Sequence, residues 1–282
     1  EGDIRWQIKK LPIGIENFEK LRQEDFYYID KTRLIEQLLT RWGEVNLFTR
    51  PRRFGKSLNM SMLQSFLDWK DKTLFDGLRI SDNQELCEEY QGKFPVVSVS
   101  LKGINGATYE EARRFLIKTT IEEDPQAIRT FQTAPELDET DHELLTQLKK
   151  KEMTNDSLVY SIRELTELRK ALWQKVIVLI DEYDVPLAKA NENGYYDEMV
   201  LLIRNLFENA LKTNSSLKFA VLTGCLRIAK ESIFTGLNNF KFIPLQIKSF
   251  DETFGFTDAE VRELLRYYGQ EKYYETVKEW YD

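Results

Sequence analysis

Histidine and cysteine are scarce in this sequence. Among its 282 residues there are one histidine, His142, and two cysteines, Cys87 and Cys225. A zinc site takes about four ligands, drawn mostly from these residue types, so we expect no such metal cluster. Each cysteine lies in a segment of ordinary composition and the two make no disulfide framework, so a reducing compartment, the cytoplasm, fits best.

Long apolar runs are also missing. No stretch approaches the roughly 20 consecutive apolar residues of a membrane-spanning helix, and the opening EGDIRWQIKK lacks the apolar segment of a signal peptide. Seven prolines and 13 glycines argue against low complexity, and 42% hydrophobic residues suffice for a core. We therefore expect one soluble core with a small appendage and no membrane contact. Because the chain does not begin with Met and ends within a helical pattern, we expect a fragment of a longer protein.

Positive charge is in deficit. The chain has 40 Lys and Arg residues against 47 Asp and Glu residues, which gives a net charge of -7. A surface of this average charge repels nucleic acid. Any nucleic-acid contact must therefore be confined to a local basic patch.

Apolar runs that alternate with helical segments predict the fold. Val176 to Ile180 is apolar at every position, as expected for a strand buried on both faces of a parallel sheet. Strands that alternate with helices form βαβ units, and such sheets bind ligands at the carboxyl ends of their strands. We therefore expect an α/β fold with a parallel sheet of about five strands flanked by helices. The predicted strands are VNLFT (45–49), FPVVSVSLKG (94–103), KVIVLIDEYD (175–184), LKFAVLTG (217–224) and, as a candidate fifth, FIPLQIKSF (242–250).

Helical spacing of apolar residues fills the segments between these strands. A T-x-x-E capping box at Thr257 and Glu260 starts a late helix, and a second one begins near residue 270. These two helices lead us to divide the chain into a core over 1–250 and the start of a helical lid over 251–282. The other predicted helices are 30–43 with Asp30 as N-cap, 56–70, 109–170 with a polar connector at 132–141, and 196–212.

The stretch RPRRFGKS (50–57) has the end of a phosphate-binding loop. Its last three residues fit the pattern G-x-x-x-x-G-K-[ST], but Arg50 occupies the position of the first glycine. The stretch lies between a predicted strand and a predicted helix, where loop amides and the helix N-terminus converge on phosphate. In that frame Lys56 reaches the β- and γ-phosphates and the Ser57 hydroxyl binds Mg²⁺. The residues expected to hold ATP are Arg52, Arg53, Phe54, Gly55, Lys56, Ser57 and Leu58.

A solvated basic turn is the alternative for this stretch. Four basic residues lie within seven positions, a density that suits a nucleic-acid backbone as well as a triphosphate. Pro51 removes one amide donor from the loop, but the amides of residues 52–57 remain available.

The strand 175–184 ends in a second motif. Asp181 and Glu182 follow the apolar run and fall at the carboxyl edge of the predicted sheet. There Asp181 can hold the water shell of Mg²⁺ and Glu182 can polarise an attacking water, unless the strand simply ends in a charged turn. A pair of acids without a histidine base favours hydrolysis of a phosphoanhydride.

The next strand adds further candidates at its end. Thr223 is placed to sense the γ-phosphate. Arg227 and Lys230 are either phosphate contacts, in this or a neighbouring subunit, or ordinary helix-surface charge. His142 is expected on an exposed helix face. The residues expected in the core are Trp42, Trp69 and Trp173.

These stretches together resemble the AAA-ATPase-like family, in which the ATPase domain is typically joined to a C-terminal nuclease-like domain of the PD-(D/E)XK type. The resemblance covers essentially the whole chain. It implies a P-loop NTPase fold, similar to archaeal-type ATPases with an additional catalytic-Glu strand, and a downstream nuclease-like domain as a partner. The stretches that carry it are LPIGIENFEKLRQEDFYYIDKT, LFTRPRRFGKSL, VIVLIDEYDVPL, LTGCLRIAKESIFTGLNN and the final WYD.

The resemblance also implies that RPRRFGKS is the family's own form of the loop. It carries ATP and Mg²⁺ over to four positions of this chain, Lys56, Ser57, Asp181 and Glu182. The roles of Asp30, Lys31 and Arg227 stay open, as do the choice between adenine and guanine and the oligomeric state.

We therefore expect a module that binds Mg-ATP and hydrolyses it slowly to switch an attached or partner domain. The alternative is a non-catalytic relic of this fold whose basic loop grips nucleic acid or a protein partner. A nuclease activity of this chain is poorly supported, because Asp181 and Glu182 lack the downstream E-x-K spacing that such a metal site would need.

Overall fold

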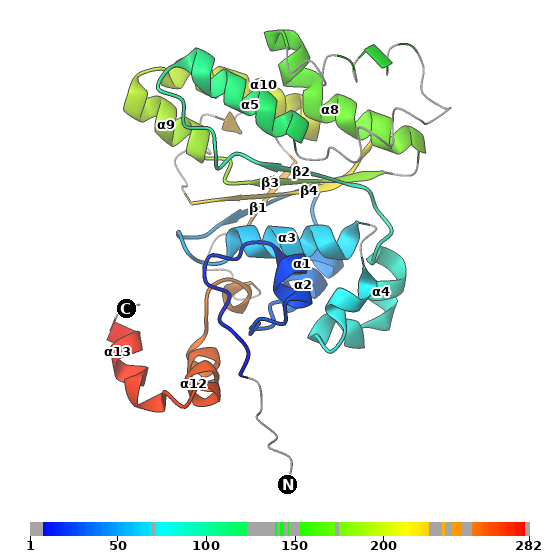
Figure 1. The fold of residues 1–282 in the computed structure, drawn as a ribbon. Coiled ribbons are helices and arrows are strands. Elements are labelled where there is room, and N and C mark those ends of the chain that lie inside the picture. Colours follow the sequence, from blue (N-terminus) through cyan, green and yellow to red (C-terminus); the bar gives the residue numbers. More distant parts are fainter. Residues whose placement is uncertain are drawn as a thin grey trace.

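The computed structural model describes most of the chain and shows a layered α/β protein (Figure 1). Residues 8–68, 71–122, 139, 142–143, 146, 153–172, 175–225, 233–234, 239–243 and 250–279 are described. The strands are β1 Val45–Thr49, β2 Val96–Ser100, β3 Val176–Asp181, β4 Leu217–Gly224 and β5 Phe240–Ile243. The helices are α1 Phe18–Gln23, α2 Arg33–Arg41, α3 Lys56–Leu67, α4 Gln84–Tyr90, α5 Tyr109–Glu122, α8 Asn155–Leu172, α9 Val185–Asn193, α10 Tyr196–Leu211, α12 Asp258–Tyr267 and α13 Tyr274–Glu279.

The sheet has the order β2-β3-β4-β1-β5, and every neighbouring pair is parallel. The predicted α/β fold with a parallel sheet of five strands is therefore confirmed. Strand β4 lies between β1, which leads into the RPRRFGKS loop, and β3, which ends in the acidic pair. The resemblance to catalytic-Glu ATPases implies an additional strand beside the loop strand, and β4 occupies that place.

Helices cover both faces of the sheet. In Figure 1, α5, α8, α9 and α10 lie above it, and α1 to α4 lie below it. Alternate residues of β3 pack against the two helical layers. Val178 and Ile180 belong to the core above the sheet, and Ile177 and Leu179 belong to the core below it. This double burial explains why the strand is apolar at consecutive positions.

The fifth strand and the N-cap of α2 differ from their predictions. The fifth strand is Phe240–Ile243, whereas residues 244–249 of the predicted run 242–250 lie outside the described residues. It is an edge strand with three half-exposed positions, so its apolar signal is weak. Asp30 is not the N-cap of α2, because Thr32 holds that position. Asp30 Oδ1 instead accepts hydrogen bonds from the backbone N and the hydroxyl of Thr32.

Trp42 is 36% exposed, which corrects its expected place in the core. It packs on Phe219 at the rim of the lower layer, with a ring-centroid distance of 5.3 Å. His142 is exposed in a helical position, as expected. Trp69, Trp173 and nearly all of the connector 132–141 lie outside the described residues.

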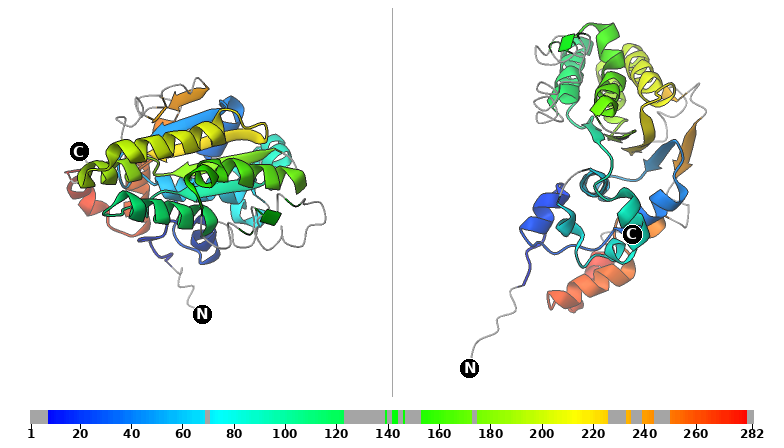
Figure 2. Two further views of the ribbon diagram at one scale, coloured as in Figure 1. Left: turned by 90° about the horizontal axis from the view of Figure 1, so that it is seen from above. Right: turned by 90° about the vertical axis from the view of Figure 1, so that its right-hand side faces the viewer.

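The helices α12 and α13 lie below the lower layer, away from the sheet (Figures 1 and 2). Neither contains a buried residue. The predicted capping box is present, because the Thr257 hydroxyl accepts from the backbone N of Glu260 and the Thr257 amide donates to the Glu260 carboxylate. No helix in the described ranges is both long and apolar enough to cross a membrane.

Candidate active site

The candidate residues gather at the carboxyl ends of β1, β3 and β4. Thr49 of β1 lies beside Gly224 of β4 in the register, and Ile180 of β3 lies beside Leu222. The chain leaves these strands along one edge, where the amide of Arg50 donates to the Gly224 carbonyl at 3.0 Å. Residues that are distant in sequence are therefore brought together by strand register alone.

The RPRRFGKS loop wraps around the N-terminus of α3. Arg53 and Gly55 have positive φ angles of 67° and 72°, so the chain turns back sharply at both positions. Within the described part of the chain, the amides from Arg52 to Leu58 donate no hydrogen bond to the protein. These amides and the positive end of the helix dipole form a ready site for an anion.

Lys56 folds back into this loop. Its side chain is buried, and Nζ donates to the carbonyl of Pro51 at 3.0 Å and to that of Arg50 at 3.3 Å. A third contact is to Sγ of Cys225, at 3.1 Å, just beyond β4. The ammonium therefore already lies inside the loop, between it and the end of β4.

Asp181 is the meeting point of the predicted site. Its Oδ2 accepts a hydrogen bond of 2.5 Å from the Ser57 hydroxyl, and its Oδ1 accepts one from the Thr223 hydroxyl. Three residues predicted separately, at the end of β3, at the start of α3 and near the end of β4, thus form one cluster. Hard oxygen ligands of this kind are those that Mg²⁺ prefers, so the residues present fit a Mg-nucleotide.

Glu182 follows in a strained backbone conformation, with φ of 54°. A non-glycine residue at positive φ is uncommon, and such strain is concentrated at functional sites. Burial raises the pKa of Glu182, and the negative charge of Asp181 raises it further, whereas Lys102 and Lys56 partly offset both effects. Lys102 stands just beyond β2 and is paired with Glu16 at 2.6 Å.

Arg50 is a structural anchor that the motif did not predict. It is only 1% exposed, and its guanidinium donates to the carbonyls of Thr49 at 2.8 Å and Ile243 at 3.0 Å. It also stacks on the ring of Phe254, with Cζ 4.8 Å from the centroid. Among the described residues that carry a side chain, positive φ occurs only at Asp25, Arg53 and Glu182. Position 50 therefore does not need glycine, and its side chain ties the loop to β5.

The remaining predicted residues differ in accessibility. Arg52 and Arg53 are exposed at the tip of the loop, and Phe54 and Leu58 are half-buried. Arg227 and Lys230 lie outside the described residues, so their expected contacts with phosphate stay predictions.

Gly224 is required by close packing. A Cβ at this position would lie 2.4 Å from Cε1 of Tyr183 and 2.7 Å from Oδ1 of Asp184. The following amide, that of Cys225, donates to Oδ2 of Asp184 at 3.0 Å. The turns after β3 and β4 therefore hold each other, which fixes Thr223 and Asp181 side by side.

Comparison with known sequences assigns this chain to a protein family. The sequence model of a family described as "Predicted AAA-ATPase" matches residues 12–234, which include the loop, the acidic pair and Thr223. The chain belongs to this family. A protein of Azotobacter chroococcum mcd 1, described as "Uncharacterized protein in vnfD 5'region", is 31% identical over 257 residues. The alignment with this AAA-ATPase-like chain covers 90% of the chain and 44% of that relative.

Proposed function

We propose that this chain binds Mg-ATP and hydrolyses it slowly, and that the cycle switches an attached or partner domain. The observation that carries the proposal is the cluster of Ser57, Asp181 and Thr223 at the mouth of the loop, whose amides from Arg52 to Ser57 donate no hydrogen bond within the described part of the chain. Membership of a predicted AAA-ATPase family supports nucleotide use.

The proposed roles follow from the position of each group. Lys56 would exchange its contacts with loop carbonyls for oxygens of the β- and γ-phosphates. Ser57 and Asp181, which are already hydrogen-bonded to each other, would hold Mg²⁺. When bound, Mg²⁺ would neutralise charge on the phosphate oxygens.

Glu182 would orient the attacking water and take its proton. A carboxylate whose pKa is raised by burial is a better base than an exposed one, provided that it is ionised at the working pH. Thr223, which donates to Asp181, would report the state of the γ-phosphate to β4.

The switched partner is part of the proposal. The chain spans less than half of the relative it matches, which leaves room for a further domain in proteins of this kind. The resemblance suggests a nuclease-like domain after the lid, and we propose it as the element that the ATPase controls, inside the cytoplasm. The division into a core over 1–250 and a lid from 251 belongs to the same proposal.

The role of Glu182 tests the hydrolytic part. We expect Glu182→Gln to retain Mg-ATP binding and to lose turnover by about 10² or more, the usual effect of removing a general base. Binding and phosphate release are measured on the same sample. Glu192→Gln, at an exposed pair with Lys189 in α9, is the control and should retain turnover. Undiminished turnover in Glu182→Gln would remove this residue from the proposed role.

A further inference from the structure

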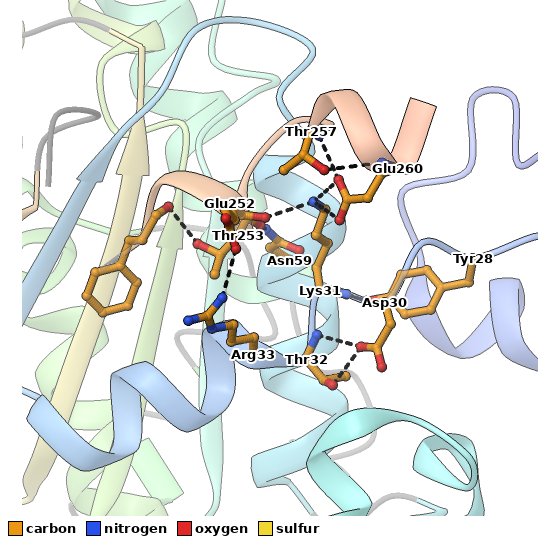
Figure 3. A network of polar contacts seen from close by, with 11 residues as sticks. Tyr28, Asp30, Lys31, Thr32, Arg33, Asn59, Glu252, Thr253, Thr257 and Glu260 are labelled. Atoms are coloured by element: carbon orange, nitrogen blue, oxygen red, sulfur yellow. Dashed lines mark hydrogen bonds and ion pairs between the residues drawn. The ribbon is translucent and has the colours of Figure 1, made fainter. Parts of the chain in front are cut away.

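The stretch from Tyr28 to Thr32 lies against the start of the lid, far from it in sequence (Figure 3). Lys31 is only 8% exposed, and its Nζ donates to both carboxylate oxygens of Glu260 at 2.7 Å. The same ammonium donates to the carbonyl of Glu252 at 2.8 Å. One side chain thus binds both ends of a segment that precedes and opens α12. We call this segment, residues 252–260, the lid base.

The backbone around Lys31 is itself fixed. The amide of Lys31 donates to the hydroxyl of Tyr28 at 3.2 Å. Asp30 accepts from the amide of Thr32 at 2.8 Å through Oδ1 and from the amide of Arg79 at 2.7 Å through Oδ2. Lys31 therefore projects from a rigid support, which makes it suited to hold another segment in place.

The lid base also contacts the phosphate loop and its helix. The amide of Gly255 donates to the carbonyl of Phe54 at 3.1 Å, and Asn59 of α3 donates to the carbonyl of Thr253 at 2.9 Å. Packing is tight, because a Cβ at Gly255 would lie 2.9 Å from the Phe54 ring. The lid base is thus bonded both to Lys31 and to the loop and its helix.

We propose that Lys31 is a positioning residue, which holds the lid base against the phosphate loop and thereby couples nucleotide binding to the placement of α12. The nucleotide half of this inference rests on the proposed function. A loop that is supported at Phe54 presents its amides in fixed positions, so loss of the support weakens binding. Because coupling is reciprocal, the bound nucleotide should tighten the lid base by the same factor.

The first test needs no nucleotide. Hydrogen exchange of the Gly255 amide is compared in wild type, Lys31→Met, Glu260→Gln and Lys31→Arg. We expect the first two variants to exchange about fivefold faster or more, the lower end of typical coupling, and Lys31→Arg to be partly rescued because it keeps the charge. Lys9→Met, which removes the exposed ion pair with Asp25, is the control and should match wild type. Equal exchange in wild type, Lys31→Met and Glu260→Gln would overturn the proposed support.

The second test adds Mg-ATP to the same proteins. We expect ATP to slow the exchange of the Gly255 amide in wild type. We expect Glu260→Gln to raise KM by a factor similar to that slowing. Its kcat at saturation should stay within about twofold of wild type, because Lys31 and Glu260 touch no reacting atom. A purely structural role would not separate KM from kcat in this way. Weakened support with unchanged KM would refute the coupling. Failure of wild type to bind ATP would refute the proposed function and the coupling, while the first test would still decide whether Lys31 holds the lid base.

Discussion

At the end of β3, side chains from three elements converge on the carboxylate of Asp181. Its two oxygens accept from Ser57 and Thr223, and the next residue, Glu182, is held at positive φ. Asp181 is buried, and these donors satisfy the hydrogen-bonding capacity of its carboxylate oxygens. Under the proposed function, Asp181 would bind the cation, and Glu182 lies next to it in a strained backbone conformation.

The pH dependence of turnover follows from Glu182. Its pKa is raised by burial and by Asp181, and the carboxylate is the active form, so turnover should fall, as pH decreases, at a higher pH than for an ordinary glutamate. Lys102 lowers this pKa, so Lys102→Met should move the acid limb of the kcat profile to still higher pH. Lys118→Met, on α5, is the control. A limb that stays in place or moves down would contradict the assignment of Glu182 as the base.

Arg50 gives a prediction that opposes the sequence motif. Arg50→Gly restores the usual first glycine, yet it removes the donors to the carbonyls of Thr49 and Ile243. We expect it to lower the free energy of unfolding by about 2 to 3 kcal/mol, the scale of losing hydrogen bonds from a buried charged group. Urea unfolding measures this, with Arg52→Ala, at an exposed site, expected within about 0.5 kcal/mol of wild type. A variant at least as stable as wild type would show that Arg50 is no anchor.

At the scale of elements, a helix or strand is easiest to predict from sequence when its residues share the same surroundings or carry a local motif. Strand β3 is apolar at consecutive positions because both of its faces are covered, and the capping box of α12 needs only two residues three positions apart. Edge strand β5 has half-exposed positions and therefore a weak apolar signal, and it begins at Phe240, two residues before the predicted run 242–250.

The missed interactions join distant parts of the chain. Arg50 donates to Ile243, and Lys31 pairs with Glu260, across 193 and 229 positions respectively. No local pattern encodes such partners, because the register of the sheet and the path of the lid base decide them. The predicted catalytic cluster could be found because its members follow strands whose carboxyl ends must share one edge.

The capping box of α12 supplies the element-scale prediction. Thr257→Ala removes the acceptor for the Glu260 amide, and we expect a loss of about 1 kcal/mol, the usual cost of an N-cap. Because α12 contains no buried residue, the loss should show as faster hydrogen exchange within α12, with little change in global unfolding. Thr276→Ala, exposed on α13, is the control. Faster exchange across the core strands instead would mean that α12 unfolds together with the core.

The whole molecule combines a sheet that is covered on both faces with two helices, α12 and α13, that contain no buried residue. The two layers bury the sheet on both faces, whereas α12 and α13 are held through the lid base and through Tyr27, whose ring contacts Tyr267 and Tyr268. The loop and the acidic pair are anchored in the sheet, and the lid base contacts the loop. This arrangement is the one that the proposed coupling between nucleotide binding and the lid base requires.

The central claim is that the RPRRFGKS loop binds a Mg-nucleotide. Calorimetric titration of Mg-ATP into wild type and Lys56→Ala, with Lys20→Ala at an exposed position of α1 as the control, tests it most directly. We predict that wild type and Lys20→Ala bind and that Lys56→Ala loses affinity by at least about tenfold, because the buried ammonium of Lys56 lies inside the loop, whereas the buried guanidinium of Arg50 is bonded to the carbonyls of Thr49 and Ile243. No binding to wild type, or equal binding to all three proteins, would contradict the account. Either result would favour the alternative, in which the exposed Arg52 and Arg53 form a basic patch that binds nucleic acid or a protein partner.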